Sequence, residues 1–525
     1  MTPLLLLAIA LSPLLQAQDE PPGKCSLSGT VVNSVTGEPL SKVSLALVPL
    51  GGANRVAFVT ATDAEGRFAM IELEPGRYHL NGKRNGYLET SYGARRPEGD
   101  GAILRLEAGQ SLPELKLKLI PFGVIAGVIR DSDGEPLDGA RVSVAQLTYA
   151  YGKPRVEGYD STETDDLGQY RIRGLKPGKY YVGVKADVDR QTRVDSSKTK
   201  AAPEGPVPTV YPGTADISLA APVEVAAGAR VAGIDITMAK ARTYTVSGRV
   251  VTASGGGATG ATLNLRAREH GMDLDSELST TTRNANGDFE IRGIQAGHYY
   301  LSALRAGEVT VSPLDVTGNM EGVRVVLGKG GQVRASVAME DGKPIKPERW
   351  QIFLTVEGRR GYFLEPENER FAAQNNAAPD HYEVRVERLA PGTYVKSIRA
   401  GDADILNDGL TVAQGASVQF EVTLADDAGR LEGTVTGGDD QPESGATVVL
   451  VPKLRARSDL FKSATTDQFG HFEFATLAPG EYKVFAWDDV EPGIWNDPAF
   501  LKENEKRGEP VTVAAKGKET VKIKL

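Results

Sequence analysis

The chain of 525 residues has little of what catalytic and metal-binding proteins usually depend on. It contains one cysteine, five histidines and three tryptophans, and aromatic residues make up only 6% of it. The single cysteine, Cys25, excludes an intramolecular disulfide. The histidines form no HExxH motif, which a zinc peptidase uses to hold its metal and activate water. We therefore expect that the protein is not an enzyme and carries no metal and no other cofactor.

Charge of one sign and long apolar runs are also scarce. The net charge is −9, from 60 basic and 69 acidic residues that are mixed along the chain, whereas a nucleic-acid-binding protein usually shows a basic face or stripe. We therefore expect no nucleic-acid partner.

The apolar segment Leu4–Leu15, with Leu15-Gln16-Ala17 behind it, resembles a secretory signal peptide. It is too short to span a bilayer as a stable anchor. We expect residues 1–17 to be cleaved, which leaves no membrane span. The mature protein is then secreted, periplasmic or associated with the cell envelope.

Glycine and proline are abundant, with 59 and 30 residues, as expected for many short strands joined by turns. The stretch DQFGHFEFATLAPGEYKVFAW, Asp467–Trp487, alternates apolar and polar residues between two turns, which is a β-hairpin pattern. Related phrases recur at Asp63–Tyr78, Asp165–Tyr180, Asn284–Tyr299 and, in a divergent form, Pro379–Tyr394. A phrase that recurs with fixed internal spacing marks a repeated structural unit.

The aromatic residue of the strand and the tyrosine of the following PGxY turn keep a constant separation in most copies. The pairs ten residues apart are Phe68/Tyr78, Tyr170/Tyr180, Phe289/Tyr299 and Phe472/Tyr482. In the divergent copy the same alignment pairs Tyr382 with Tyr394, twelve residues apart. We expect the strand aromatics to point into a core between two sheets. The PGxY tyrosines either do the same or bond back to a turn.

Every unit also opens and closes alike. The opening strand carries a glycine at one fixed place, namely Gly29, Gly127, Gly248 and Gly433, with Ala335 in the fourth unit. A glycine inside a strand usually marks a bulge or a close approach of two backbones. Each unit closes with two alternating strands around a turn, centred on Gly109, Gly228, Gly318, Gly415 or Gly517.

These patterns predict an all-β protein of five tandem antiparallel β-sandwich domains, each with roughly seven strands. We define unit 1 as residues 25–120, unit 2 as 121–240, unit 3 as 241–328, unit 4 (divergent) as 329–425 and unit 5 as 426–525. Unit 5 should hold one short helix, because Asp497 is a good N-cap, Pro498 a good first residue and Gly508 a good stop. The linkers are short, so we expect a semi-rigid string of domains, with mobile loops at 91–100 and 189–208.

The frame G-x-V, G-x-P-L-x-G-A-x-V, D-x-x-G-x-F and P-G-x-Y resembles the carboxypeptidase regulatory-like domain, most clearly in units 1, 2 and 5. The stretch AWDDVEPGIWNDPAFLKENEKRGEPV, residues 486–511, resembles the terminal unit of large secreted bacterial proteins built from such domains. The resemblance implies a transthyretin-like (prealbumin-like) sandwich, related in fold to carbohydrate-binding and collagen-adhesin repeats, in an extracytoplasmic setting. It implies no peptidase activity, because this domain accompanies carboxypeptidases and is not the catalytic domain.

Binding residues are harder to single out. Aromatic side chains outside the strand frame are the candidates for stacking on sugar rings: Tyr149, Tyr151, Tyr211, Trp487 and Trp495. The alternative for the two tryptophans is that they pack the helix of unit 5 against its sandwich. Acidic residues near the repeated turns, such as Asp63 and Asp467, either bond their own backbone or contribute to calcium sites.

Three hypotheses about function follow. The first is a non-catalytic scaffold or adhesion protein of the cell envelope or secreted medium, and the alternative is a carbohydrate-binding protein of the cell surface or periplasm. A metal-dependent hydrolase is the third. The expected partner is an extracellular protein or glycan that the sequence does not identify.

Overall fold

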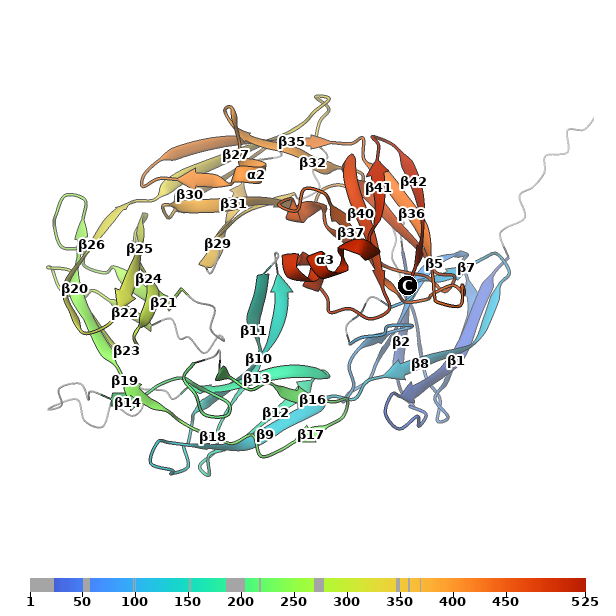
Figure 1. Cartoon of the computed structure of the whole chain (residues 1–525), viewed down its shortest axis with the longest axis horizontal. Coiled ribbons are helices and arrows are strands. Elements are labelled where there is room, and N and C mark those ends of the chain that lie inside the picture. Colours follow the sequence, from blue (N-terminus) through green and yellow to red (C-terminus); the bar gives the residue numbers. More distant parts are fainter. Residues whose placement is uncertain are drawn as a thin grey trace, which may run out of the picture.

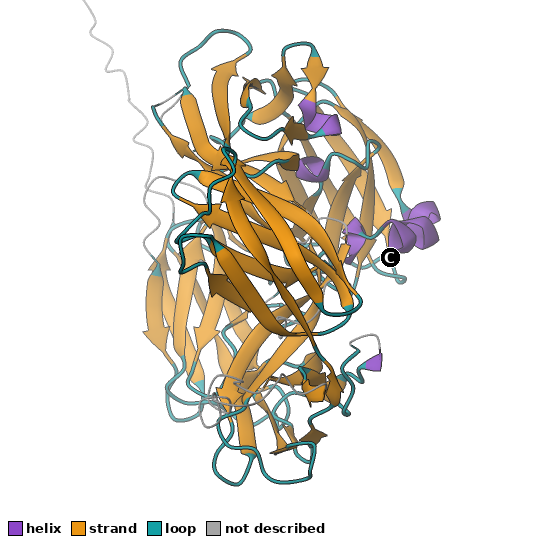
Figure 2. Cartoon of the chain, turned by 90° about the vertical axis from the view of Figure 1, so that its left-hand side faces the viewer, coloured by secondary structure: helices purple, strands orange, loops and turns teal. Residues whose placement is uncertain are grey.

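A computed structural model describes residues 23–50, 57–97, 99, 101–150, 153–185, 204–216, 219–268, 278–345, 350–356, 359–368 and 370–525. Almost all regular structure in these residues is β-strand, which confirms the all-β prediction. The units follow one another round a ring (Figure 1), and a side view shows the strands of neighbouring units stacked at different angles (Figure 2). The predicted signal peptide lies outside the described residues. Within them, no helix has the length and apolarity needed to cross a membrane.

The strand arrangement of unit 1 recurs, with variations, in the other four units. Its opening strand, β1, lies between antiparallel β4 and parallel β8, and a second sheet has the order β3-β2-β5, with β6 and β7 on the outer edge of β5. The parallel pair of first and last strands is a detail that the sequence pattern did not predict. The apolar faces of the two sheets meet in one core that includes Leu27, Leu45 and Leu117. The strands of unit 1 are β1 (Cys25–Asn33), β2 (Ser44–Pro49), β3 (Phe58–Ala61), β4 (Arg67–Leu73), β5 (Gly76–Lys83), β6 (Thr90–Ser91), β7 (Leu104–Leu106) and β8 (Ser111–Leu119).

Unit 2 repeats this plan with a longer hairpin. β10 and β11 extend well beyond the sheet, and the closing strand is split in two, β17 and β18, both parallel to β9. The strands of this unit are β9 (Gly123–Arg130), β10 (Arg141–Ala150), β11 (Lys153–Glu163), β12 (Gln169–Leu175), β13 (Gly178–Lys185), β14 (Glu204–Pro206), β15 (Thr209–Val210), β16 (Val223–Val225), β17 (Arg230–Val231), β18 (Ile236–Thr237) and β19 (Lys240–Arg242).

In unit 3 the two layers are joined, because β25 pairs with β24 along its length and its first two residues also pair with the end of β26. The strands are β20 (Tyr244–Thr252), β21 (Thr262–Ala267), β22 (Leu278–Thr281), β23 (Asp288–Ile294), β24 (Gly297–Arg305), β25 (Glu308–Val316) and β26 (Met320–Lys329).

Unit 4 joins its layers at another corner, where β29 pairs with β30. It contains a four-residue helix, α2, that the sequence did not predict. Its elements are β27 (Gly331–Met339), β28 (Gln351–Val356), β29 (Arg359–Pro366), β30 (Phe371–Ala377), β31 (Asp380–Glu387), β32 (Tyr394–Ala400), β33 (Ala403–Asp404), α2 (Ile405–Asp408), β34 (Leu410–Val412) and β35 (Ser417–Ala425).

Unit 5 returns to the plan of unit 1 and adds the predicted helix, α3. The Asp497 side chain accepts a hydrogen bond from the Ala499 N–H, Pro498 is the first helical residue, and a short 3₁₀ turn leads to Gly508. Its elements are β36 (Gly429–Thr436), β37 (Thr447–Pro452), η2 (Ser458–Leu460), β38 (Lys462–Thr465), β39 (His471–Leu477), β40 (Gly480–Trp487), η3 (Ile494–Asn496), α3 (Pro498–Asn504), η4 (Glu505–Arg507), β41 (Glu509–Val513) and β42 (Lys518–Lys524).

The repeated tyrosine is both buried and bonded back to its turn. The hydroxyl groups of Tyr78, Tyr180 and Tyr482 donate to the carbonyl oxygen four residues earlier, at 2.7 to 2.8 Å. In unit 4 this role belongs to Tyr382, whose hydroxyl donates to the Ala378 carbonyl at 2.6 Å. The alignment that gave Tyr394 this role is therefore wrong.

The strand pairing of unit 4 explains the error. Ala372 lies opposite Ala335, as Phe68 lies opposite Gly29 in unit 1. Ala372 thus takes the place of the strand aromatic and precedes Tyr382 by ten residues, the same spacing as in the other units. The PGTY sequence that ends at Tyr394 belongs to the connection between β31 and β32.

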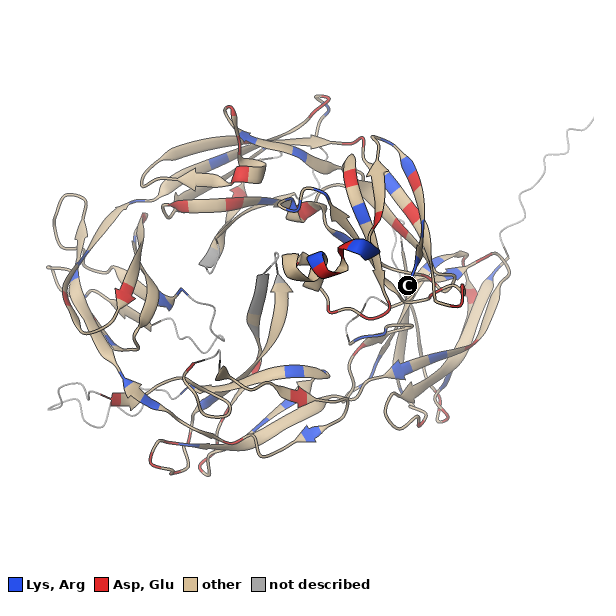
Figure 3. Ribbon diagram, viewed as in Figure 1, with Lys and Arg blue, Asp and Glu red and all other residues tan. Residues whose placement is uncertain are grey.

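The units form a closed ring and not the open string that the short linkers suggested. Unit 5 meets unit 1 where the chain closes on itself (Figure 1), and charged residues of both signs lie on the elements near this contact (Figure 3). Four arginines of unit 1 pair there with acidic residues of unit 5, across what we call the closing seam. Its ion pairs are Arg77–Glu473, Arg95–Glu443, Arg95–Asp488, Arg96–Asp489, Arg96–Glu491 and Arg105–Asp467. Loop 91–100, expected to be mobile, therefore carries two of the arginines that close the ring.

Candidate functional site

The acidic residues of the repeated turns are engaged by their own backbone. Asp63, Asp165 and Asp467 each accept hydrogen bonds from the amides two and four residues later. Asn284 accepts one from the Asp288 amide at 2.9 Å, so an uncharged residue makes the bond to the amide four residues later as well. The prediction that these residues close the turns is confirmed, and no group of three or more His, Cys, Asp or Glu that would hold a metal occurs in the described ranges.

A buried threonine beside each turn was missed by the sequence reasoning. Thr62, Thr164, Thr282 and Thr466 donate from the hydroxyl to a carbonyl across the sandwich and accept from an amide nearby. Their position just before the turn Asp or Asn was visible in the repeats. These threonines join the opening loop to the hairpin and so belong to the scaffold.

His381 and His471 each precede a glutamate by two residues, which places both side chains of such a pair on one face of a strand. The His381 ring lies 3.0 Å from the Thr411 hydroxyl, and His471 is exposed at the start of β39. His298 pairs with Asp315 at 2.7 Å, and its hydrogen bond lowers the pKa of that carboxyl group. The contacts of His381 and His298 join neighbouring strands, and among the residues that the structure describes no group of three possible metal ligands forms around them.

Of the five aromatic residues proposed to stack on sugars, Trp487 is engaged in packing. It is 6% exposed, stacks on Phe485 with ring centroids 5.5 Å apart, and contacts Phe500 of α3. Trp495 packs against the same apolar cluster and remains partly exposed. Tyr211 packs against the core of unit 2, and Tyr151 lies outside the described residues.

The structure brings two of the other candidates to one place. The β10–β11 hairpin of unit 2 points towards the middle of the ring, beside α3 (Figure 1). There Gly493, in the turn that leads into η3, lies against the backbone of Tyr149, and Trp495 belongs to η3. A role of Tyr149, Tyr211 and Trp495 in glycan binding stays a prediction.

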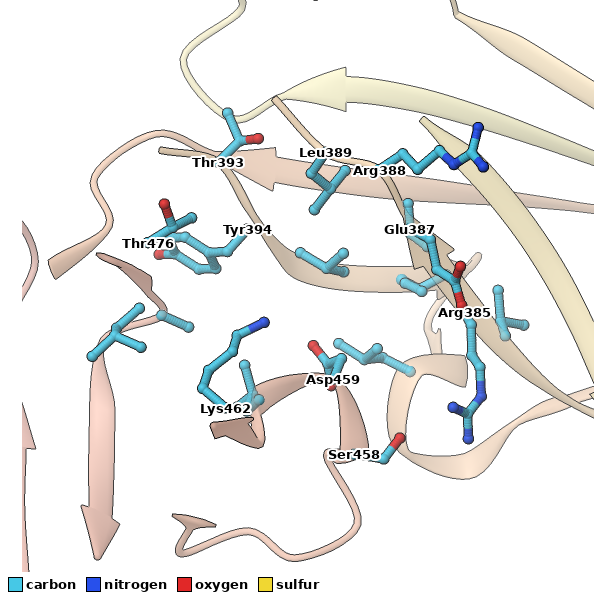
Figure 4. A pocket seen from close by; sticks show the side chains of 18 of the residues that line it. Arg385, Glu387, Arg388, Leu389, Thr393, Tyr394, Ser458, Asp459, Lys462 and Thr476 are labelled. Atoms are coloured by element: carbon cyan, nitrogen blue, oxygen red, sulfur yellow. The ribbon is translucent and has the colours of Figure 1, made fainter. Parts of the chain in front are cut away.

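A concave site between two units was not predicted from the sequence. A cavity of about 600 Å³ lies between units 4 and 5, within the range of small-molecule and peptide sites. We call it the seam pocket (Figure 4). Its lining residues are Glu383–Pro391, Thr393–Val395, Ile398, Leu406, Ala456, Ser458–Leu460, Lys462, Ala475–Ala478 and Tyr482.

The seam pocket has an apolar floor and a charged rim. Ile398, Leu460 and Leu477 contribute apolar side chains from both units. Arg385 pairs with Glu383 at 2.8 Å, and the ammonium group of Lys462 extends towards Tyr394 and Asp459 (Figure 4). The pocket is thus suited to a ligand with both apolar and polar groups.

Two phenols face this pocket. The Tyr394 hydroxyl donates to Asp427 at 2.8 Å, and burial together with this hydrogen bond raises the pKa of Tyr394. Burial raises the pKa of Tyr482 to about 12. Both groups therefore remain neutral at physiological pH.

The two units touch at the mouth of the pocket by a few polar contacts. The Gly392 amide donates to the Thr476 hydroxyl at 3.1 Å, and Arg457 donates to the Val395 carbonyl at 3.1 Å.

Thr476 has a positive φ of 60°. Gly174 and Gly293 occupy the equivalent position in units 2 and 3 and also have positive φ, so this conformation belongs to the repeat. Arg388, with φ of 56°, has no such counterpart. Neither local pattern nor spacing predicts the pocket, because it exists only where two units meet.

Comparison with known proteins identifies the first two units. Residues 26–112 and 124–210 each match the carboxypeptidase regulatory-like domain. This confirms the resemblance for units 1 and 2. No curated protein matches the chain.

Three solved structures show a distant similarity to parts of the chain. The Bacillus anthracis TIE protein is 14% identical, with 58% of this chain and 50% of that chain covered and a TM-score of 0.17. The alignment thus spans about half of the length of TIE. The Streptococcal ancillary pilin is 14% identical (58% and 99% covered, TM-score 0.21), and the minor pilin of Streptococcus agalactiae is 15% identical (42% and 96% covered, TM-score 0.24). Scores this low carry no argument about function.

Proposed function

We propose that this chain, whose residues 26–112 and 124–210 are carboxypeptidase regulatory-like domains, is a non-catalytic scaffold or adhesion protein of the cell envelope or the secreted medium. One observation carries the proposal. The residues that recur from unit to unit are engaged in holding the sandwiches together, through the strand glycine, the core aromatic, the bonded tyrosine and the turn Asp or Asn. The residues that vary lie on the surface, where partners bind.

Two features support a role as a spacer or platform. The linkers are short, since β9 begins four residues after the end of β8, and β27 begins two residues after β26. The first unit also docks on the last, which limits relative movement of the units. A scaffold of this kind presents its loops at set positions around a ring.

Fractionation with mass spectrometry of the N-terminus tests the location. We expect the protein outside the cytoplasm, beginning at Gln18 after removal of residues 1–17. A chain that stays in the cytoplasm with an intact N-terminus contradicts the proposal. Cross-linking and pull-down from the native envelope fraction then identify the partner.

The second candidate function is carbohydrate binding. The meeting of Tyr149 with the segment that holds Trp495, at the middle of the ring, favours it. A glycan array separates the two functions: a carbohydrate-binding protein retains a glycan that is lost on Tyr149→Ala or Trp495→Ala, with Tyr151→Ala as a third variant. Retention of no glycan above background removes this candidate and leaves the scaffold role intact.

A further inference from the structure

The strand that carries the repeated tyrosine, called here the tyrosine strand, has a neighbour along its outer edge in units 1, 2, 3 and 5. In unit 3, β25 covers β24 from Gly297 to Arg305. In units 1 and 2 the cover is in two pieces, β7 with β6 on β5, and β16 with β15 on β13. In unit 5, β41 covers β40 from Gly480 to Val484. Some of the five residues after the tyrosine are thus paired on this edge in each of these units.

Unit 4 differs at this point. β34 pairs only with Asp380–Tyr382 of β31, and β28 occupies the opposite edge. The short helix α2 leads into β34 and contacts β31 at the same side. Beyond it, no strand among the described residues pairs with the outer edge of the segment Glu383–Glu387. An open edge presents backbone N–H and C=O groups that can pair with another strand.

The open edge faces the seam pocket. Five consecutive residues, Glu383 to Glu387, line the cavity. Because alternate side chains of a strand point to opposite faces, a cavity that touches all five lies beside the edge of the strand and not on one face. The far wall comes from unit 5, where β38 and β39 are themselves edge strands of their sheets.

We propose that the seam pocket binds an extended peptide of a partner protein, which adds to β31 as the missing edge strand of unit 4. Five residues of strand span about 16 Å, and main-chain hydrogen bonds would supply much of the affinity, as in other complexes formed by strand addition. The inference deepens the proposed scaffold function by naming the class of partner. It rests on that function only for its biological setting.

Charge indicates which peptides fit. Lys462 and Arg388 are exposed on the pocket rim and form no ion pair within the described part of the chain. Lys462 directs its ammonium group into the cavity (Figure 4). A peptide with apolar residues for the floor and a carboxylate near Lys462 satisfies both parts of the site.

The chain itself provides a probe, because β25 is the strand that covers the equivalent edge in unit 3. A labelled synthetic peptide with its sequence, EVTVSPLDV, has alternating apolar residues and two carboxylates. We expect saturable binding to the full-length protein by fluorescence anisotropy. Hydrogen exchange should slow at Glu383–Glu387. No binding at about 1 mM peptide, or protection confined to other strands, overturns the proposal.

Two controls distinguish strand addition from non-specific binding of the peptide. The same peptide methylated at alternate backbone nitrogens loses donors to the edge, so its binding should fall to background; unchanged binding contradicts strand pairing. Lys462→Glu should weaken binding about tenfold by placing like charges together. Lys522→Glu, the same charge change on exposed β42 outside the pocket, should leave it unchanged. If the two variants weaken peptide binding equally, the assigned site is wrong. A failure of the proposed scaffold function is detected separately, by the fractionation experiment.

Discussion

The glycine of the opening strand shows how a single position that tolerates no side chain constrains the strand pairing of a whole unit. A Cβ atom at Gly248 would overlap the carbonyl oxygen of Val323 on the parallel strand β26, where the pairing register shifts. In unit 4 the corresponding pair of strands, β27 and β35, runs without a shift, and Ala335 fits there. The glycine is therefore required where the backbone of the closing strand lies against it. This also holds for Gly433 of unit 5, where a Cβ atom would overlap the Val521 carbonyl although β36 and β42 pair without a shift.

Gly248→Ala should consequently destabilise unit 3 by about 1–3 kcal/mol, as overpacking in a core does. Hydrogen exchange of the β20 and β26 amides in the full chain measures this locally, which matters because several units do not unfold as one transition. Gly256→Ala is the control, since Gly256 has an ordinary backbone conformation and its nearest neighbour lies 3.7 Å away. Equal exchange in both variants would contradict the role of this close backbone approach.

Tyr382 and Tyr394 give a test of which tyrosine belongs to the repeat. Tyr382 is 1% exposed and bonds a buried carbonyl, so Tyr382→Phe should cost about 1–3 kcal/mol by leaving that acceptor without a donor. Tyr394 bonds the carboxylate of Asp427, which water can solvate, so Tyr394→Phe should cost less. Local hydrogen exchange at β31 measures both. A larger effect of Tyr394→Phe would restore the original alignment.

Alkaline pH should destabilise unit 5 through Tyr482. Its pKa is raised to about 12 in the folded state by burial, against an ordinary value of 10.0. As the pH rises, the unfolded chain therefore releases this proton first. The contribution of Tyr482 to the free energy of unfolding is constant below about pH 10 and falls between about pH 10 and 12. Hydrogen exchange at β40 is too fast at such pH, so near-ultraviolet circular dichroism follows the loss of packing. Tyr482→Phe should flatten this part of the profile, and an unchanged slope would assign it to other groups.

At the scale of elements, the repeated turns explain how much the sequence could predict. Strand alternation, the turn Asp or Asn and the helix cap at Asp497 act within a few residues, so each was visible locally. The alignment of unit 4 failed because the PGTY letters ending at Tyr394 match the motif, whereas the structural equivalent of Phe68 is an alanine, Ala372. Only strand pairing distinguishes the two, and pairing is not local.

The turn residue Asp165 gives a prediction at this scale. It accepts hydrogen bonds from Leu167 and Gln169 and forms no ion pair within the described residues. Asp165→Ala should destabilise the β11–β12 connection by about 1–2 kcal/mol through the loss of two hydrogen bonds. Asp165→Asn should be nearly neutral, because Asn284 performs the same task in unit 3. Thermal unfolding of the two variants, with exchange rates at β12, provides the comparison.

At the scale of the whole molecule, neither the ring nor the seam pocket could be predicted. The ring depends on ion pairs between residues hundreds of positions apart, and the pocket on residues of two different units. The closing seam is mainly ionic. Within the described residues, no apolar cluster contains residues of both unit 1 and unit 5. Exposed ion pairs contribute about 0.2–1 kcal/mol each and weaken with salt, so the seam should hold the ring closed only while several pairs act together.

The ring should therefore open when the charges on one side of the seam are reversed. Arg95→Glu with Arg96→Glu places acids opposite Glu443, Asp488 and Asp489, and we expect a larger radius of gyration by small-angle X-ray scattering. The control is Lys116→Glu with Lys118→Glu, an equal charge change on the exposed face of β8, which should leave the radius unchanged. Adding Glu443→Arg, Asp488→Arg, Asp489→Arg and Glu491→Arg to the open variant should close the ring again, because the pairs of Arg95 and Arg96 are then restored with their signs exchanged. An open variant that this exchange fails to close would show that loop 91–100 acts through its shape and not through its charge.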